Sequence, residues 1–394
     1  MTGIQKTLSI NWIFLIAFFA EIANGIVLPI LPSYATLLNA STFLVSAIAS
    51  TSGLSRMLSE IYFGNLSDHK GRRPVMTVEV CLLTVFPVLA ALASEPGALF
   101  IVAIMQGAAS SMLSIVAVLV ADLSQGHRLN RAMGTLLMVQ GFGSSIGSFI
   151  GGYIADQFGF HSAFYVSALF ALPALGVVIV KVQDARLAFQ RSSQRHHYRF
   201  WTKAREILGD KEVLAICLLA SMTYFAQGLI SAFFPLRGKE LGLSETQIGL
   251  VFASRALLST VARLPASFAI GVAGGIVWAI VSSFVEAISV GSVAFAQNFE
   301  GVTMAITIQG LGYGSFLIMA RALAVSTDQN RRGMTIGLLG MFGWLGQTFL
   351  LLVLGGFSNF TTLSNLFLVG SLIILSGTII SVVVLRLRRA AASE

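Results

Sequence analysis

The sequence predicts an all-α membrane protein in which twelve transmembrane helices form two pseudo-symmetric bundles of six. Three observations support this fold class: the 394-residue chain is 56% hydrophobic and 11% charged, it contains twelve long apolar segments, and its halves repeat one another. Soluble domains carry about 25% charged residues, so a water-soluble globule could not cover its surface with so few. Two cysteines are too few for a secreted disulfide scaffold.

Each apolar segment is long enough for a membrane-spanning helix, which needs about 20 mostly apolar residues. The expected spans cover residues 10–31, 43–65, 75–93, 97–121, 133–155, 161–180, 213–236, 245–269, 273–296, 300–325, 333–357 and 362–385.

Lysines and arginines set the orientation of these spans. With the N-terminus in the cytoplasm, 19 of the 25 basic residues lie on the cytoplasmic side, two (Arg237 and Lys239) lie outside and four lie within spans. The positive-inside rule therefore places both termini in the cytoplasm. We expect the chain to be a multi-pass protein of the cell (inner) membrane. The same bias explains the net charge of +8 without nucleic acid as a partner.

We expect three parts: a bundle over residues 1–180, a basic cytoplasmic linker over 181–211, and a second bundle over 212–394. The linker is either a solvated connection or a surface helix on anionic lipid that inserts Phe200 and Trp201.

The two bundles repeat at a constant offset of 203 residues. Ten identical pairs lie on this diagonal: Gly25 and Gly228, Pro32 and Pro235, Ser41 and Ser244, Gln106 and Gln309, Gly107 and Gly310, Arg128 and Arg331, Gly134 and Gly337, Met138 and Met341, Gly143 and Gly346, and Gly152 and Gly355. Two similar bundles can rock about a site at their interface and expose it to each side of the membrane in turn, which is alternating access.

The connection between the second and third spans reads GNLSDHKGRR over residues 64–73. It resembles the signature loop of the major facilitator superfamily, G-x-L-[small]-D-x-x-G-R-[R/K], and span count, linker and repeat extend the resemblance to the whole chain. The resemblance implies the fold of that superfamily, a secondary transporter that is not an enzyme, and a monomer.

The loop residues predict an ionic lock on the cytoplasmic side. Gly64 and Gly71 permit a tight turn and close helix approach, and Asp68, Arg72 and Asp122 are expected to form an ionic cluster. In the superfamily this cluster resembles a lock on the outward-facing state, with Asp68 near the helix N-terminus at residues 333–337. The alternative is a simple topology determinant. At the repeat offset, residues 267–276 read SFAIGVAGGI and carry no charge.

The fifth span contains Gly134, Gly143, Gly147, Gly151 and Gly152. This pattern resembles the glycine-rich antiporter motif of drug:proton exporters, although Ser148 stands where that family has proline. Glycines at four-residue spacing let helices approach closely, so we expect Gly143, Gly147, Gly151 and Gly152 to form a pliable interface with the eighth span. Generic helix packing is the alternative.

Charged residues within spans are costly and usually face a polar cavity or a partner. Glu21, midway along the first span, is the first candidate for binding substrate or proton, because burial favours the neutral form of a carboxyl group. Arg255 and Arg321 are candidates for an anionic substrate group or for pairing with Glu21. Arg56 and Glu60, four residues apart on one helix face, are expected to pair.

Further polar residues within spans receive weaker assignments. Gln106 and Gln309 are candidate cavity residues or hydrogen-bond partners of neighbouring helices. Ala103 replaces the arginine that many proton-coupled relatives place three residues before this glutamine. No function is assigned to Glu79, and Glu286 is as much a structural as a functional candidate.

No P-loop, metal-ligand pattern or nucleophile–base group is found in the sequence, so we expect no cofactor, no bound metal and no ATP-driven step. The leading hypothesis is proton-coupled efflux of small amphipathic organic compounds. The alternative is a carrier of small organic anions by symport, exchange or uniport. A non-transporting membrane sensor is the third interpretation, disfavoured by terminal tails of about ten residues.

Overall fold

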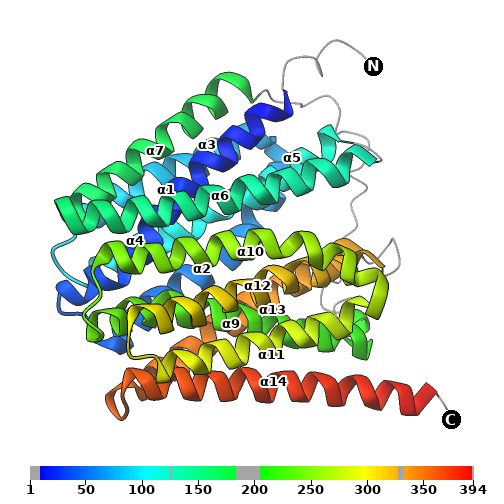
Figure 1. The fold of residues 1–394 in the computed structure, drawn as a ribbon. Helices are drawn as coiled ribbons and strands as arrows, with labels where there is room; N and C mark the ends of the chain where they lie inside the picture. The colour runs from blue at the N-terminus through cyan, green and yellow to red at the C-terminus, as the bar shows by residue number, and fades with distance from the viewer. Residues whose placement is uncertain (1–8, 125–126, 183–204, 327–331, 393–394) are drawn as a thin grey trace. The chain divides into compact units, whose positions relative to one another are not determined.

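The computed structural model describes residues 9–124, 127–182, 205–326 and 332–392, and these residues form helices and short connections (Figure 1). The α-helices are α1 (Ile10–Leu37), α2 (Thr42–Lys70), α3 (Arg72–Leu92), α4 (Ala98–Ser110), α5 (Met112–Leu123), α6 (His127–Phe158), α7 (Phe160–Lys181), α9 (Lys211–Glu240), α10 (Glu245–Ala273), α11 (Gly275–Phe295), α12 (Phe299–Ser326), α13 (Arg332–Gly356) and α14 (Leu363–Ala392). Most of the expected linker lies outside the described residues.

The helices match the expected spans, and the all-α membrane fold is confirmed. Eleven segments of the described chain are long and apolar enough to cross a membrane. The twelfth expected span is α2, a 29-residue helix that lies outside this set because its serines, threonines and Arg56 lower its hydropathy. The fourth span consists of two helices, α4 and α5, which are separated at Ser111.

The chain divides into two compact units. Unit 1 comprises described residues of Met1–Ala40, Thr51–Arg195 and Leu243–Ala256, and unit 2 those of Ser41–Ser50, His196–Gly242 and Leu257–Glu394. Each unit therefore contains one short segment from the other half of the sequence. The two segments are related by the repeat, since Ser41 and Ser50 correspond to Ser244 and Ala253.

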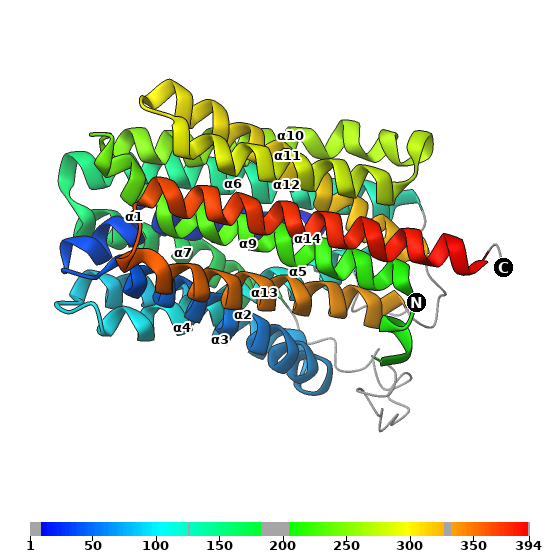
Figure 2. The same cartoon turned by 90° about the horizontal axis from the view of Figure 1, so that it is seen from below.

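Both units use the same helix pairings. In unit 1, α1 packs against α6 and α7, and α3 packs against α4 and α7. In unit 2, α9 packs against α13 and α14 (Figure 2), and α11 packs against α12 and α14. The first span of each half thus contacts its fifth and sixth spans, and the third contacts its fourth and sixth, as expected for a duplication.

Glycines bring the first and fifth spans of unit 1 into backbone contact. A Cβ atom on Gly147 would meet the backbone of Ile22, and a Cβ atom on Gly151 would meet that of Ile26. Gly25 of α1 faces α6 in turn, where a Cβ atom would lie 2.7 Å from the carbonyl oxygen of Ser144. In unit 2, a Cβ atom on Gly346 would lie 2.5 Å from the Cβ atom of Ser221 on α9.

The short segments from the opposite half make repeat-related contacts. In unit 1, a Cβ atom on Gly152 of α6 would lie 2.9 Å from the Cα atom of Gly249 on α10, and the Ser145 hydroxyl donates to the Ala253 carbonyl oxygen at 2.9 Å.

In unit 2, the corresponding residues meet in the same way. Gly355 of α13 abuts the side chain of Ser46 on α2, and the Thr348 hydroxyl donates to the Ser50 carbonyl oxygen at 3.4 Å. All four pairs of corresponding residues keep the offset of 203, so the repeat extends to individual contacts.

The turns between spans also keep the repeat. Gly71, which precedes α3, has a φ of 95°, and Gly274, which precedes α11, has a φ of 80°. Asn39 and Gly242, at the corresponding turns after the first span of each half, have φ values of 66° and 74°. These left-handed conformations favour glycine, with asparagine the best tolerated alternative.

The glycine contact between α1 and α6 predicts a sharp difference between two substitutions on one helix. Gly147→Ala places a methyl group against the Ile22 backbone and should destabilise the protein by about 1–3 kcal/mol. Gly134→Ala is the matched control, because no atom lies within 4 Å of its new Cβ atom and alanine has the higher helix propensity. Thermal unfolding in detergent measures both, and equal melting temperatures would contradict the packing argument.

Candidate functional site

The expected ionic lock contains one clear ion pair. Gly71 separates helices α2 and α3, so α3 begins at Arg72. The Arg72 guanidinium lies 2.5 Å from a carboxylate oxygen of Asp122, near the end of α5. The Arg72 side chain is 13% exposed and that of Asp122 is 41% exposed. The pair therefore joins the third span to the fourth in a partly desolvated setting.

The other lock residues lie around this pair. Asp68 is exposed in the last turn of α2. Gly64 does not have the role expected of it: it lies inside α2, and a Cβ atom there would meet no atom within 4 Å, so no helix approaches it closely. The helix expected to face Asp68, α13, begins at Arg332, and an interaction between Asp68 and this helix stays a prediction.

Glu21 lies midway along α1 on the side of α6. A Cβ atom on Gly143 of α6 would lie 2.9 Å from the Cβ atom of Glu21 and 2.8 Å from the carbonyl oxygen of Phe18. Glu21 is half-buried. The absence of a side chain at Gly143 thus provides the space that the base of the Glu21 side chain occupies.

The interface glycines divide between two partners. Gly143, Gly147 and Gly151 contact α1, whereas Gly152 contacts α10. The reason is geometric: residues four apart share a helix face, but consecutive residues point about 100° apart. The expected contact with the eighth span therefore involves Gly152, and the rest of the stripe packs against the first span.

Arg255 is 5% exposed and lies on α10 within unit 1. The α10 helix runs antiparallel to α6, because Gly249 lies against Ser148 and Gly152 whereas Ala253 accepts a hydrogen bond from Ser145. Arg255 follows about 3 Å further along the axis at 1.5 Å per residue. It therefore reaches the depth of Gly143, which is also the depth of Glu21.

The remaining candidates are placed individually. Gln106 is half-buried on α4, whereas its repeat counterpart Gln309 is fully buried on α12. Arg321 belongs to α12, but its side chain lies outside the described part of the structure.

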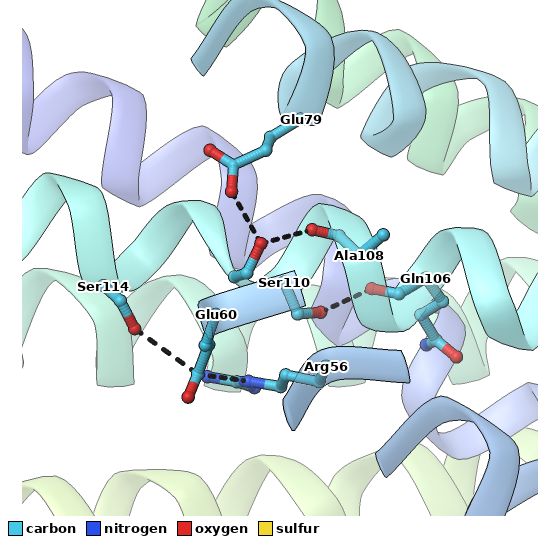
Figure 3. Close-up of polar contacts among 8 residues, drawn as sticks. Arg56, Glu60, Glu79, Gln106, Ala108, Ser110 and Ser114 are labelled. Atoms are coloured by element: carbon cyan, nitrogen blue, oxygen red, sulfur yellow. Dashed lines mark hydrogen bonds and ion pairs between the residues drawn. The ribbon is translucent and has the colours of Figure 1, made fainter. Parts of the chain in front are cut away.

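A polar cluster of unit 1, formed by Arg56, Glu60, Glu79, Ser111 and Ser114, lies around the break in the fourth span. Figure 3 shows these residues, with Ser111 as the unlabelled side chain between Glu79 and Ala108. The expected pair of Arg56 and Glu60 is confirmed at 3.1 Å. Sequence reasoning passed over Glu79, which is 0% exposed on α3 and accepts a hydrogen bond from the Ser111 hydroxyl at 2.6 Å. A carboxylate within the 75–93 apolar segment was the signal for this site.

Comparisons with known proteins agree with this architecture. Residues 13–226 and residues 216–394 each match the family model of the Major Facilitator Superfamily. An uncharacterized MFS-type transporter of Methanocaldococcus jannaschii is 23% identical over 367 residues, 90% of this chain and 94% of that protein. The multidrug resistance protein MdtG of Salmonella paratyphi A is 22% identical over 350 residues, 83% of this chain and 82% of MdtG.

A solved structure of a mutant nucleoside transporter NupG has the same fold. It superimposes with a TM-score of 0.79 at 14% identity and covers 95% of this chain and 99% of NupG.

The pair of Arg72 and Asp122 predicts measurable coupling. We expect a double-mutant cycle of Arg72→Gln and Asp122→Asn to give a stabilising interaction of roughly 1 kcal/mol, the upper end for exposed pairs, because the arginine is mostly desolvated. Unfolding of the four proteins in detergent at low salt measures it. Additive effects of the two substitutions would mean that the ion pair contributes nothing to stability.

Proposed function

Because this chain belongs to the Major Facilitator Superfamily, we propose that it is a secondary transporter that exports small amphipathic organic compounds in exchange for protons by alternating access. The observation that carries the proposal is the common depth of a carboxylate and an arginine within the spans of unit 1, Glu21 on α1 and Arg255 on α10.

The proposed coupling step uses the charge of Glu21. When the carboxylate is ionised, attraction to Arg255 holds α1 and α10 together along the glycine faces of α6. Protonation removes the negative charge, so this attraction is lost and α10 can separate from α6 at the Gly152–Gly249 contact. Coulomb attraction is strong where water is excluded, and the 5% exposure of Arg255 satisfies this condition.

The substrate class is proposed from the residues at repeat-related positions. The counterpart of Glu21 in unit 2 is Tyr224, whose ring packs edge-on against Trp344 with centroids 4.9 Å apart. A carboxylate suits a cationic group and an aromatic pair suits an apolar ring, so each unit taken by itself presents side chains that favour amphipathic aromatic cations. The name of the relative MdtG, a multidrug resistance protein, supports efflux of such compounds.

A pH-gradient experiment on Glu21→Gln tests this proposal. In proteoliposomes with an imposed pH gradient, the wild type should move ethidium, an amphipathic aromatic cation, against its gradient. Glu21→Gln should reduce the pH-driven component roughly tenfold or more, within the range typical of coupling between two binding sites. The flux is followed by ethidium fluorescence, with and without a protonophore.

Glu95→Gln is the matched control, because Glu95 is exposed in the connection between α3 and α4. It should transport like the wild type. The proposal fails if the wild type shows no pH-driven flux, or if Glu21→Gln equals it. Transport of fluorescein that Arg255→Gln abolishes would favour the organic-anion alternative.

The lock residues give a second prediction. Asp68→Asn should weaken ethidium transport several-fold while leaving membrane insertion intact, because the exposed Asp68 carries no packing role and its charge is what the lock needs. Transport per inserted molecule is compared with that of Glu95→Gln, an exposed acidic residue between α3 and α4. Wild-type transport by Asp68→Asn would leave only the topology interpretation of the loop.

A further inference from the structure

Glu79 is a buried carboxyl group that lacks the partners an ionised carboxylate requires. Its side chain is 0% exposed, and the neighbouring buried side chains of α3, Met76, Val80 and Leu83, are apolar. Within the described chain, Oε1 accepts a hydrogen bond from Ser111, and Oε2 has no hydrogen-bond partner. Burying a charge with an unsatisfied oxygen is strongly unfavourable.

The contacts of Ser111 point to a proton on Glu79. Its hydroxyl oxygen lies 2.6 Å from Glu79 Oε1 and 2.6 Å from the carbonyl oxygen of Ala108 (Figure 3). Both of these oxygens are acceptors when Glu79 is ionised, but a serine hydroxyl has a single hydrogen. A protonated Glu79 resolves the conflict, because it donates to Ser111 and Ser111 then donates to Ala108.

We propose that Glu79 is a proton-binding site, shared with Ser111 at the break in the fourth span, and that release of its proton rearranges this break. On release, the carboxyl O–H bond breaks and the proton passes to water. The Ser111 hydroxyl then turns from the Ala108 carbonyl oxygen to the carboxylate. The proposal deepens the proposed function, since it rests on proton coupling, but the protonation itself can be measured without transport.

The position of the break connects this site to the rest of unit 1. The Ala108 carbonyl oxygen also accepts the backbone N–H of Ser111 at 3.3 Å, so both of its contacts lie where α4 ends and α5 begins. On the α4 side, Gly107 abuts the backbone of Ser52 on α2. On the α5 side, Asp122 pairs with Arg72. A change at Ser111 therefore acts between the contact of α4 with α2 at Gly107 and the ion pair of Arg72 and Asp122 in the lock.

Charged and titratable side chains lie on most of the helices around Glu79. The elements that pack against α3 are α1, α4, α5 and α7, and α2 contributes to the same polar cluster. Besides Glu79, the described charged or titratable side chains on these helices and on α3 itself are Glu21 and Tyr34 on α1; Arg56, Glu60, Tyr62, Asp68, His69 and Lys70 on α2; Arg72, Arg73 and Cys81 on α3; Asp122 on α5; and His161, Tyr165 and Lys181 on α7.

Glu60 is the other acidic side chain of this polar cluster. Glu60 is itself held by Arg56 at 3.1 Å and is contacted by the Ser114 hydroxyl at 3.4 Å. The paired state of Glu60 leaves Glu79 as the member of the cluster that binds the proton.

The same device is not repeated in unit 2. The residues at the offset of 203 from Glu79 and Ser111 are Ser282 and Gly314, which cannot form a carboxyl–hydroxyl pair. A buried carboxyl does occur one turn further along α11, at Glu286, whose Cγ would lie 2.8 Å from a Cβ atom on Gly312. The pair of Glu79 and Ser111 is thus absent from the repeat-related positions 282 and 314.

Infrared spectroscopy of the full chain in lipid, recorded as a function of pH, tests the proposal directly. The wild type should show the carbonyl stretch of a protonated carboxylic acid at neutral pH, and this band should disappear in Glu79→Gln. In Ser111→Ala the band should remain and shift to higher frequency, because the hydrogen bond is lost. Glu95→Gln, an exposed substitution, should leave the band unchanged.

Ethidium flux in proteoliposomes supplies the second readout. Glu79→Gln, which mimics the protonated acid, should lose the pH-driven component of the flux. A carboxylic-acid band unchanged in Glu79→Gln, or wild-type pH-driven flux in that variant, overturns the proposal. If the wild type shows no pH-driven flux but Glu79→Gln abolishes the band, the proton site stands and the proposed function fails.

Discussion

The direct contact of helix backbones between the first and fifth spans is the constraint on which the structure depends. At Gly147 and Gly151 there is room for a hydrogen atom and nothing larger before the Ile22 and Ile26 backbones. Lipid supplies no hydrophobic force that would bring two apolar helices together, so association depends on close packing. The stripe also fixes the depth of Glu21, because Gly143 continues it by one turn, and on its other face α6 positions α10.

Much of the fold follows from sequence because membrane helices have a simple requirement. Every backbone polar group must be satisfied within lipid, so a long apolar segment becomes a helix. Helix geometry also predicted the pair of Arg56 and Glu60, because residues four apart lie on the same helix face. The repeat offset, found from identical residues, extends to contacts such as Ser145 with Ala253 and Thr348 with Ser50.

Other features could not be predicted because they depend on tertiary contacts. The separation of α4 from α5 at Ser111 lies within one continuous apolar segment, and the Ser111 hydroxyl there contacts a glutamate on another helix. Gly64 occupies a motif position that suggested close packing, yet in the described chain no atom lies within 4 Å of a Cβ atom built there. The division of the glycine stripe between α1 and α10 depends on which helix packs on each face of α6. The spacing of the glycines predicts which of them share a face, but it does not predict which helix packs against that face.

The turn at Gly71 combines a left-handed glycine with flanking charges, whereas the turn at Gly274 has the left-handed glycine alone. Both glycines adopt a left-handed conformation, yet the sequence before Gly274 has kept none of the charges that precede and follow Gly71. The reversal of the chain between the second and third spans of each half therefore does not depend on these charges. The acidic and basic side chains that flank Gly71 are therefore not required for the bend, so the second half has a backbone geometry on which a charged latch could be built by substitution alone.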